Sequence, residues 1–435
     1  MADNPSFSIV LATYGRGRRI EPTIESVLGQ TYTDFELIVV GDGCADETEA
    51  IVGSFARETF APAKITWHNL PRNSGSQSVP NNEGIRHARG DWICYLGHDD
   101  IWSPDHLACL AQTIASCDGT DFVVSGCIYY GPKDSGYYFV TGLFDASDAA
   151  FHHFFPPTSL AHRRDVTDRI GGWRDPREIT LPIDGEFLLR AAHAGMRFTS
   201  TGRITAHKFA AGHRYLSYLR LDCEEQREML RTLRTMPQIA FDEIIATSKR
   251  IGHFMTTGYS EFTSPEPGFS FERNRQNKGI NRPALQPLHG RTVIEQTAEP
   301  RALDWYNLET GHRPHRWSGP NPRPRILIPF SGERARIAIE VIGTRPALRL
   351  DEVPLYVEGR RAATRFEDVP DIGVMMIADI SLNAADYTVL TLETPMFYPH
   401  EHYETGDRRY LGIAVADIVI EPIVNAPPEE PRTPP

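Results

Sequence analysis

Two adjacent carboxylates, Asp99 and Asp100, end the segment DWICYLGHDD and are well placed to do chemistry. The apolar run before them, residues 92–96, has the length of a buried strand, and Ser103-Pro104 favours a helix start after them. In an open α/β sheet, ligands bind at the carboxyl ends of strands, where paired acidic oxygens can hold magnesium or manganese against a phosphate. A solvated turn is the alternative, because Asp is common in turns and at helix N-caps.

The residues around these acids alternate between strand-like and helical segments. Apolar runs and helical spacing predict strands over Phe7–Ala12, Phe35–Val40 and Ile65–His68, and helices over Ile20–Leu28, Glu47–Phe55 and Pro80–Ala88. This alternation indicates βαβ units and a parallel sheet. Further along, turn residues predict a hairpin between Asp121 and Val140, followed by a helix over Phe187–Ala194, a strand over Phe198–His207 and amphipathic helices over Tyr215–Ile251.

The whole chain divides into four predicted parts. Residues 1–225 form the α/β domain, and residues 226–300 form a helical and irregular connector. Residues 301–423 contain short alternating apolar runs bounded by Gly, Pro, Asn or Asp and no convincing helix, which predicts an all-β sandwich. Residues 424–435 are too polar and proline-rich to pack and should form a disordered tail.

The composition excludes several classes of protein. The 435 residues include 45 Lys and Arg against 57 Asp and Glu, a net charge of −12, which argues against a general nucleic-acid binder. The six cysteines lack paired spacing and fit reduced thiols. The sequence has no signal-like amino terminus and no apolar stretch of the roughly 18 residues that a membrane helix needs. We expect a cytoplasmic protein, with association at the inner face of the membrane and homo-oligomerisation left open.

Four blocks, in order, give the first half of the chain a resemblance to a known family. They are SIVLATY at Ser8–Tyr14, ESVLGQTYTDFELIVVGDGCADET at Glu25–Thr48, GDWICYLGHDD at Gly90–Asp100 and PIDGEFLLRAAHAG at Pro182–Gly195. Together they resemble the inverting glycosyltransferases of family 2. The fold that this resemblance implies is α/β: a GT-A domain with a Rossmann-like, mostly parallel sheet, here followed by the connector and the β-sandwich.

The resemblance also implies a nucleoside-diphosphate sugar donor and a divalent metal, Mn or Mg. A metal neutralises charge on the departing diphosphate without proton transfer. Asp100 would hold the metal and Asp99 would contact the metal or the ribose. Gly97 stands where the family usually has another acid, so His98 or Asp99 could join the metal site instead. His207 lies where related enzymes often place a late metal ligand, although a lone His near an apolar run is more often simply packed.

Other residues match the family's contacts to the nucleotide sugar. Asp42 corresponds to the nucleobase contact, and an Asp can accept hydrogen bonds from a uracil or guanine N–H. A turn Asp before a helix is the alternative. The segment Arg72–Gly84 is similar to the family's Asn-Gly loop. The remaining residues assigned to the donor are Thr13, Tyr14, Arg18, Arg72, Asn73, Gly75 and Asn82. Either arginine could bind the diphosphate as a bidentate donor, or be solvated at the surface.

Asp184 matches the family's general base, and Glu186 would support it. Inversion needs a carboxylate on the far face of the sugar to take the acceptor's proton, and such a base works best when burial raises its pKa. Asp184 could also be the N-cap of the following helix, and both roles can hold together. Arg190, six residues further on, could pair with an acid or face solvent.

We therefore predict a metal-dependent inverting glycosyltransferase acting on a glycan or lipid-linked acceptor, in bacterial surface polysaccharide synthesis. In the β-sandwich, Trp305, Tyr306 and Trp317 could stack on sugars, or could be core residues. One rival is a non-catalytic glycan-binding protein that retains the fold. A second rival is a sugar nucleotidyltransferase, but GRGRRIEPTIES lacks the lysine expected after that class's glycine-rich loop.

Overall fold

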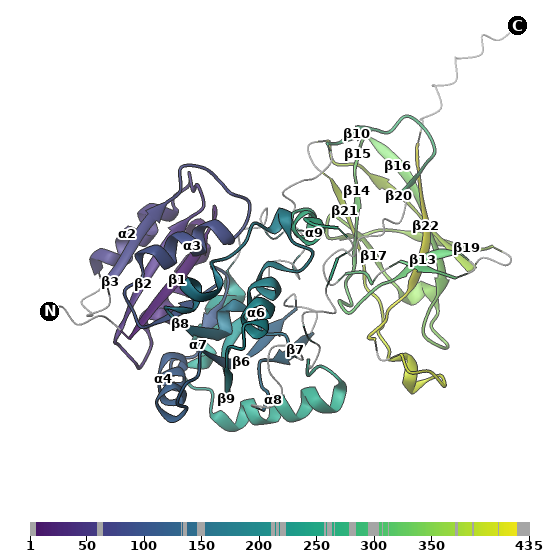
Figure 1. Cartoon of the computed structure of the whole chain (residues 1–435). Helices are drawn as coiled ribbons and strands as arrows, with labels where there is room; N and C mark the ends of the chain where they lie inside the picture. Colours follow the sequence, from purple (N-terminus) through teal and green to yellow (C-terminus); the bar gives the residue numbers. More distant parts are fainter. Residues whose placement is uncertain are drawn as a thin grey trace, which may run out of the picture. The chain divides into compact units, whose positions relative to one another are not determined.

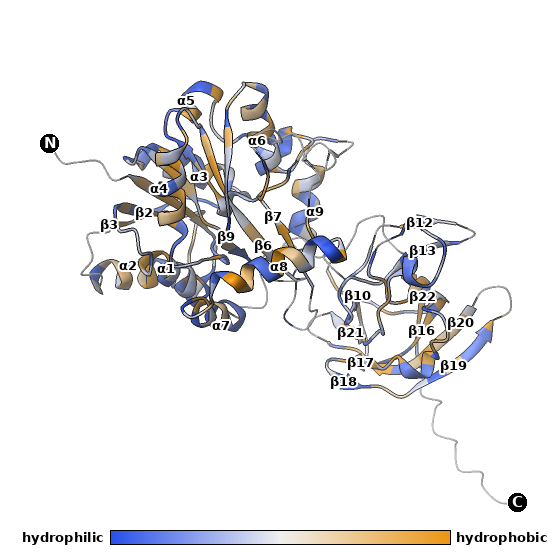
Figure 2. Ribbon diagram, turned by 90° about the horizontal axis from the view of Figure 1, so that it is seen from below, coloured by the Kyte–Doolittle hydropathy of each residue, from blue (hydrophilic) through white to orange (hydrophobic). Residues whose placement is uncertain are grey.

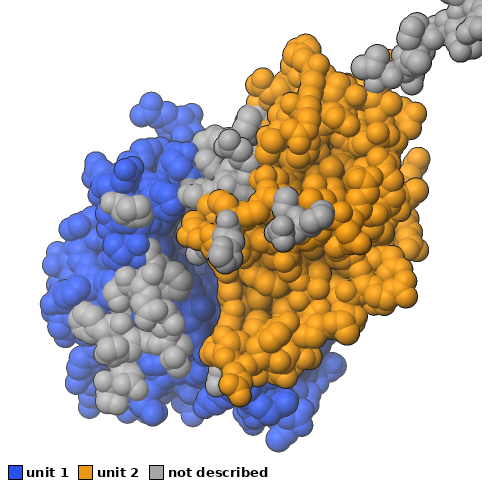
Figure 3. Space-filling view, turned by 90° about the vertical axis from the view of Figure 1, so that its right-hand side faces the viewer, with its two compact units in different colours: residues 1–133, 138–280 blue, residues 134–137, 281–435 orange. Residues whose placement is uncertain are grey.

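The structure is a computed structural model of the chain. It describes residues 6–58, 64–131, 133, 137–145, 153–209, 214, 217, 223–255, 258, 263–264, 266–277, 284–294, 304–306, 308–311, 313–369, 373–384, 387–407 and 409–423. The residues group into two compact units: residues 1–133 with 138–280, and residues 134–137 with 281–435 (Figure 3).

The first unit is built on one mixed sheet (Figure 1). Its main path runs in the order β3 (Lys64–Asn69), β2 (Phe35–Gly41), β1 (Phe7–Thr13), β4 (Trp92–Tyr95), β8 (Leu160–Arg163), β6 (Phe122–Tyr130), β9 (Phe198–Lys208) and β5 (Ile101–Trp102), and β7 (Tyr138–Thr141) pairs with β6. The first four strands are parallel, β8 is antiparallel to both β4 and β6, and β9 is parallel to β6. Consequently β9 also runs parallel to β4, and the two end at the same edge of the sheet.

Helices cover the buried strands of this sheet. They are α1 (Glu21–Leu28), α2 (Thr48–Glu58), α3 (Ser78–His87), α4 (His106–Ser116), α5 (Val166–Ile170), α6 (Ile183–His193), α7 (Glu224–Leu233), α8 (Gln238–Ile251) and α9 (Phe269–Asn277). Every residue of β2 is buried, as expected for a parallel strand with both faces covered. Helices α7 and α8 carry both polar and apolar residues along their length, which suits helices with one packed face (Figure 2).

The predicted α/β class is confirmed for the first unit. The predicted hairpin is also found, since β6 and β7 pair antiparallel. The sequence did not reveal β5 and β8, which have only two and four residues and lack a long apolar run. Helices α7, α8 and α9 lie mostly in the residues expected to form a connector, and the structure groups them with the first unit.

The second unit is a sandwich whose two larger sheets are antiparallel, as predicted, and it also contains one small parallel pair. One sheet runs β12 (Glu309–Thr310), β13 (Pro314–Trp317), β22 (Ala414–Pro422), β16 (Arg334–Gly343), β20 (Gly373–Ser381) and β19 (Thr364–Val369), with β11 (Thr292–Ile294) beside β22. The other runs β14 (Arg325–Ile328), β21 (Thr388–Leu392), β17 (Leu355–Val357) and β18 (Arg360–Arg361); β10 (Gln286–Pro287) pairs with β15 (Phe330–Ser331).

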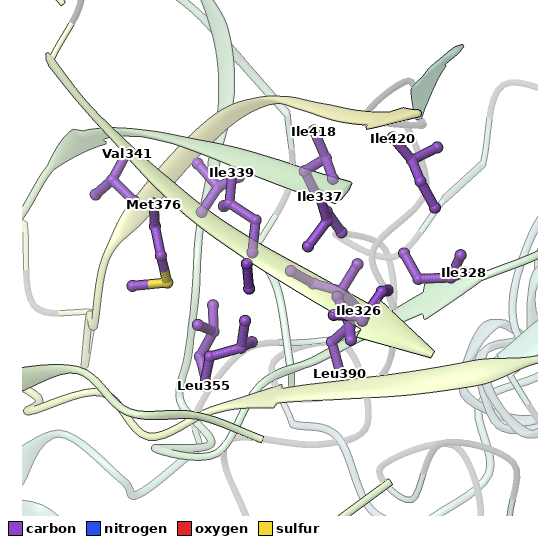
Figure 4. Packing of buried hydrophobic residues seen from close by; sticks show 14 of the residues in the cluster. Ile326, Ile328, Ile337, Ile339, Val341, Leu355, Met376, Leu390, Ile418 and Ile420 are labelled. Carbon is purple, nitrogen blue, oxygen red and sulfur yellow. The ribbon is translucent and has the colours of Figure 1, made fainter. Parts of the chain in front are cut away.

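The core of the second unit lies between its two larger sheets (Figure 4). Ile337, Ile339 and Ile418 come from the first of these sheets, and Ile328 and Leu390 from the second. All five are at most 2% exposed, so alternate residues of each strand point inward, as in other β-sandwiches. This packing explains why short alternating runs in the sequence predicted the sandwich.

Two predictions from the whole sequence, on the cysteines and on membrane helices, can be compared with the structure. All six cysteines are free thiols, and three of them are buried, which confirms the reading from their spacing. In the part of the chain that the structure describes, no helix combines the length and the apolar character required to cross a bilayer.

Candidate active site

The pair Asp99 and Asp100 lies in the turn that follows β4. The turn is closed by a hydrogen bond from the Asp100 N–H to the Gly97 carbonyl at 2.9 Å. Thr23 Oγ1, on α1, donates to the Asp100 carbonyl at 2.9 Å and holds the turn against that helix. The acids therefore lie at the carboxyl end of a buried strand, where the sequence predicted them.

Both oxygens of the Asp100 carboxylate accept hydrogen bonds. Thr158 Oγ1 donates to Asp100 Oδ2 at 2.7 Å, and Lys208 Nζ donates to the same oxygen at 3.0 Å. The backbone N–H of Phe209 donates to Oδ1 at 3.1 Å. Lys208 is the last residue of β9, so the ion pair joins the ends of two parallel strands. Asp100 is 1% exposed, and this pairing compensates the cost of burying its charge.

Asp99 has a different environment from its neighbour. Its Oδ2 accepts a hydrogen bond from Arg16 Nη2 at 2.8 Å and lies 3.5 Å from His98 Nε2. Burial alone would raise the pKa of Asp99, but the positive charge of Arg16 outweighs burial and holds that pKa well below its usual range. Arg16 Nε also donates to His98 Nε2 at 2.7 Å, so the three side chains form one buried cluster.

Asp184 lies in the first turn of α6, after the cap residue Pro182. The sequence allowed Asp184 to be the N-cap, but the helix begins one residue earlier, at Ile183. Gly185 N–H donates to Asp184 Oδ1 at 3.1 Å. Burial raises the pKa of Asp184, and the charge of Lys208 lowers it in part. The charge of Lys208 therefore acts on Asp184 as well as on its ion-pair partner Asp100.

Glu186 points to a structural contact rather than to Asp184. Its two carboxylate oxygens each accept a hydrogen bond from Arg190, at 2.9 Å from Nε and 2.9 Å from Nη2. Arg190 in turn donates to the carbonyls of Gly171 at 3.0 Å and Gly172 at 2.8 Å. Glu186 thus fixes an arginine that ties the loop after α5 to α6. The question left by the sequence about Arg190 is answered: it pairs with an acid.

Asn82 fastens the same loop from the other side. Its side chain donates to the Trp173 carbonyl and accepts from the Trp173 N–H, both at 2.8 Å. Trp173 is 4% exposed and stacks on Phe187 of α6, with ring centroids 4.7 Å apart. Asn82 therefore holds the loop and the tryptophan that pack beside the helix carrying Asp184.

Asp42 follows β2, and its carboxylate holds the loop between β3 and α3 by hydrogen bonds. Its Oδ1 accepts from Ser74 N–H at 2.9 Å, and its Oδ2 accepts from Asn73 Nδ2 at 3.1 Å and Gly75 N–H at 3.3 Å. Burial raises the pKa of Asp42, and these N–H donors lower it in part. The structure therefore brings together three residues assigned to the donor, and it uses the Asp42 carboxylate to shape the loop.

The other residues assigned to the donor are distributed around the same edge of the sheet. Thr13 is buried at the end of β1, where its carbonyl accepts from the Asp42 N–H at 2.8 Å. Tyr14, the next residue, is 37% exposed. Arg18 and Arg72 are exposed, and Arg18 lies 3.8 Å from Glu21, so neither arginine is brought into the cluster around Asp100.

The predicted metal ligands do not form a metal site in this arrangement. Both ring nitrogens of His207 are used, with Nε2 3.0 Å from Ser103 Oγ and Nδ1 3.0 Å from Tyr130 Oη. Burial lowers the pKa of His207 to about 3, so the ring is neutral. Asp99 and Asp100 are bound to Arg16 and Lys208. Among the described residues, no three His, Cys, Asp or Glu side chains are grouped so as to hold a metal ion. A divalent metal at this edge would have to displace Lys208 from Asp100 and take further oxygen ligands from the diphosphate.

Three side chains of this site were not identified from the sequence: Arg16, Thr158 and Lys208. Lys208 had a usable signal, because it follows His207 in a strand and neighbouring strand residues point to opposite faces. His207 is packed on one face, so Lys208 has to point to the other. Arg16 lies in an irregular segment and Thr158 in a three-residue 3-10 helix, and both are too short for a periodicity that would indicate which side chain turns inward.

In the second unit, the aromatic residues that could stack on sugars are mostly packed. Trp305 is 5% exposed, belongs to the core and donates from Nε1 to the Arg325 carbonyl at 2.8 Å. Tyr306 donates to the Tyr410 carbonyl at 3.1 Å. These contacts favour the core alternative for Trp305 and Tyr306. A glycan-binding role for the sandwich stays a prediction.

A sheet whose carboxyl edge carries Asp42, Asp100 and Asp184 has the arrangement expected of a glycosyltransferase. The model of the family "Glycosyl transferase family 2" matches residues 8–173. An uncharacterized glycosyltransferase of Bacillus subtilis, YwdF, is 30% identical over 192 residues, which cover 42% of this chain and 67% of that protein. The chain therefore belongs to glycosyltransferase family 2, and the resemblance found in the sequence is confirmed.

Two further relatives are similar to this chain, one over a longer stretch at lower identity and the other over a shorter stretch. An uncharacterized glycosyltransferase of Nostoc sp. is 25% identical over 259 residues, covering 57% of this chain and 76% of that protein. The poly(ribitol-phosphate) beta-N-acetylglucosaminyltransferase TarP of Staphylococcus aureus is 32% identical over 98 residues, covering 22% of this chain and 28% of TarP. The prediction that the chain is a transferase enzyme is confirmed by its family.

Proposed function

We propose that this chain transfers a sugar from a nucleoside-diphosphate sugar to a hydroxyl group of a glycan or lipid-linked saccharide, with inversion at the anomeric carbon. The acceptor oxygen forms a bond to the anomeric carbon while the bond from that carbon to the diphosphate oxygen breaks. The electron pair of the broken bond leaves with the diphosphate, and the acceptor's proton passes to Asp184. The β-sandwich would help to dock the acceptor.

One observation carries this proposal: Asp184 is a half-buried carboxylate, with a pKa raised by burial, in the field of the Lys208–Asp100 ion pair. A raised pKa makes a carboxylate a better proton acceptor at neutral pH. The ion pair lies at the carboxyl edge of the sheet, where ligands of open α/β sheets bind. Base and donor site would therefore be adjacent, as a direct displacement requires.

The donor would bind across the ends of β1, β2 and β4. Asp42 and the loop 73–75 offer a carboxylate and backbone N–H groups at the end of β2, where a base could exchange hydrogen bonds with them. We place the acceptor among bacterial polymers because TarP, similar over 98 residues, is named a poly(ribitol-phosphate) beta-N-acetylglucosaminyltransferase. Because Lys208 is already paired with Asp100, the proposed reaction is written without a step through a divalent metal.

The substitution Asp184→Asn tests the role of the base. It should lower transfer by roughly 10²–10⁴-fold, the usual contribution of a general base, because Asn cannot take a proton. Donor affinity, measured by calorimetry on a panel of nucleotide sugars, should change little because the base acts on the acceptor. Asp168→Asn, an exposed acid in α5, is the matched control and should leave both quantities unchanged.

Two outcomes would count against the proposal. A loss of donor affinity as large as the loss of transfer would show that Asp184 binds the donor rather than activating the acceptor. If the wild-type chain neither binds nor turns over any nucleotide sugar, the non-catalytic glycan-binding protein becomes the better description.

A further inference from the structure

The ammonium group of Lys208 lies at the point where the family resemblance led us to expect a metal ion. Its Nζ is 3.0 Å from Asp100 Oδ2, the oxygen of the residue to which the sequence assigned the metal. Its charge also interacts with Asp184. A cation is therefore already present beside the carboxylate to which the sequence assigned the metal.

We propose that the Lys208 ammonium takes the place of a divalent metal and balances the charge of the departing diphosphate. This inference rests on the proposed glycosyl transfer. It makes Lys208 a catalytic residue, because its N–H groups would touch the leaving diphosphate oxygens. It also makes the reaction independent of added manganese or magnesium.

The surroundings of Asp100 argue against a metal in the same position. Each oxygen of the Asp100 carboxylate already accepts from a donor, and Thr158 and the Phe209 N–H supply two of the three contacts. The residue at 97 has no side chain, and a Cβ built there would lie 3.0 Å from the Asp100 carboxyl carbon and closer still to Oδ2. An acid at that position would thus displace the very carboxylate that Lys208 binds. The missing side chain at Gly97 therefore leaves room for the Asp100 carboxylate where Lys208 binds it.

The position of Lys208 suits a ligand as well as a counter-ion. A lysine ammonium has three N–H donors, and among the described residues only Asp100 accepts a hydrogen bond from it. Its side chain is 22% exposed, so solvent or a ligand reaches it. A compact ammonium can bind phosphate oxygens as a point charge.

The charges remain balanced through the proposed transfer. Before the reaction Lys208 faces the negative charges of Asp100 and Asp184. During the transfer Asp184 gains the acceptor's proton and loses its charge, while the diphosphate gains the electron pair of the broken bond. The charge that Lys208 faces therefore moves from Asp184 to the leaving group, so a single fixed ammonium can serve both states without a second cation.

Binding of UDP and GDP, measured by calorimetry in excess EDTA and again with manganese, tests this inference. The wild-type chain should bind at least one of them in EDTA, and manganese should change its affinity by less than about twofold. Lys208→Met, which keeps the length and removes the charge, should weaken binding by roughly tenfold or more, the loss expected for a charge-assisted hydrogen bond. Lys208→Arg should retain part of the affinity. Lys249→Met, an exposed lysine in α8, is the control.

The outcomes separate this inference from the proposed function. Nucleotide binding that needs manganese, or an unchanged affinity in folded Lys208→Met, overturns the role of Lys208 and leaves glycosyl transfer standing. The absence of any binding, with or without manganese, overturns both. If Lys208→Met does not fold, as judged by thermal melting, the EDTA comparison on the wild-type chain still decides, because it needs no variant.

Discussion

Replacing Arg16 with methionine would remove the main counter-ion of a buried carboxylate. The Arg16 side chain is 0% exposed, that of Asp99 is 8% exposed, and their nitrogen and oxygen lie 2.8 Å apart. Asp99 Oδ1 has no hydrogen-bond partner in the described part of the chain, so the pair with Arg16 is its principal compensation. Breaking a buried ion pair by removing one partner costs roughly 3–5 kcal/mol of unfolding free energy.

Protonation of Asp99 limits this cost in a way that depends on pH. In the variant, burial is no longer opposed by Arg16, so the pKa of Asp99 should rise above its usual value of 3.8. Holding an acid protonated costs about 1.4 kcal/mol for each pH unit above that value. The charge penalty is therefore at most about 4 kcal/mol at pH 7 and about 1.6 kcal/mol at pH 5. In the wild type the lowered pKa keeps Asp99 ionised over this window, and its contribution is lost only below about pH 4.

Urea unfolding followed by tryptophan fluorescence measures the effect, since Trp92, Trp102 and Trp173 report on the first unit. The variant should lose about 3–4 kcal/mol at pH 7 and markedly less at pH 5. Arg18→Met, two residues away on an arginine whose side chain is 77% exposed, should cost less than about 0.5 kcal/mol at either pH. A deficit in Arg16→Met that is the same at pH 5 and pH 7 would refute the reasoning, because the loss would then come from packing.

Two other substitutions probe the surroundings of the site. Gly97→Ala places a Cβ against the Asp100 carboxylate, so Asp100 should shift from Lys208 and nucleoside-diphosphate release should slow by roughly tenfold; an unchanged rate would mean that the contact is not needed. Glu186→Gln weakens the pair with Arg190 and should lower the free energy of unfolding by about 1–2 kcal/mol while leaving the transfer rate nearly unchanged. A large loss of rate without loss of stability would instead give Glu186 a direct catalytic part.

The layout of the chain could be predicted from the sequence where the hydrophobic signal was long. Strands such as β1 and β2 are continuous apolar runs, and their alternation with helices fixes a parallel sheet. The short strands β5 and β8 were not predicted, because their strand conformation depends on pairing with other strands of the sheet and not on their own composition. The amphipathic pattern over Tyr215–Ile251 predicted helices that complete the first domain, and the structure groups α7–α9 with the first unit.

The acidic residues of the candidate site could be predicted from the sequence, but the basic residues that pair with them could not. Asp42, Asp100 and Asp184 follow strands or open a helix, so topology alone places them at one edge. Their partners come from distant segments: Arg16 is 83 residues from Asp99, and Lys208 is 108 residues from Asp100. Spacing along the sequence carries no information about such pairs. The sequence could therefore name the carboxylates without showing that Asp99 and Asp100 are each paired with a basic side chain.

The choice between a metal and an ammonium depends on which face of β9 meets the acids. Neighbouring residues of a strand point to opposite faces, so His207 and Lys208 cannot both reach Asp100. His207 is held on its own face by Ser103 and Tyr130, and a shift of one residue would break both contacts and bury the ammonium among them. The register of β9 is thus fixed by the free-energy cost of burying the Lys208 ammonium on the wrong face of the sheet. In that register, the group that faces Asp100 is the lysine.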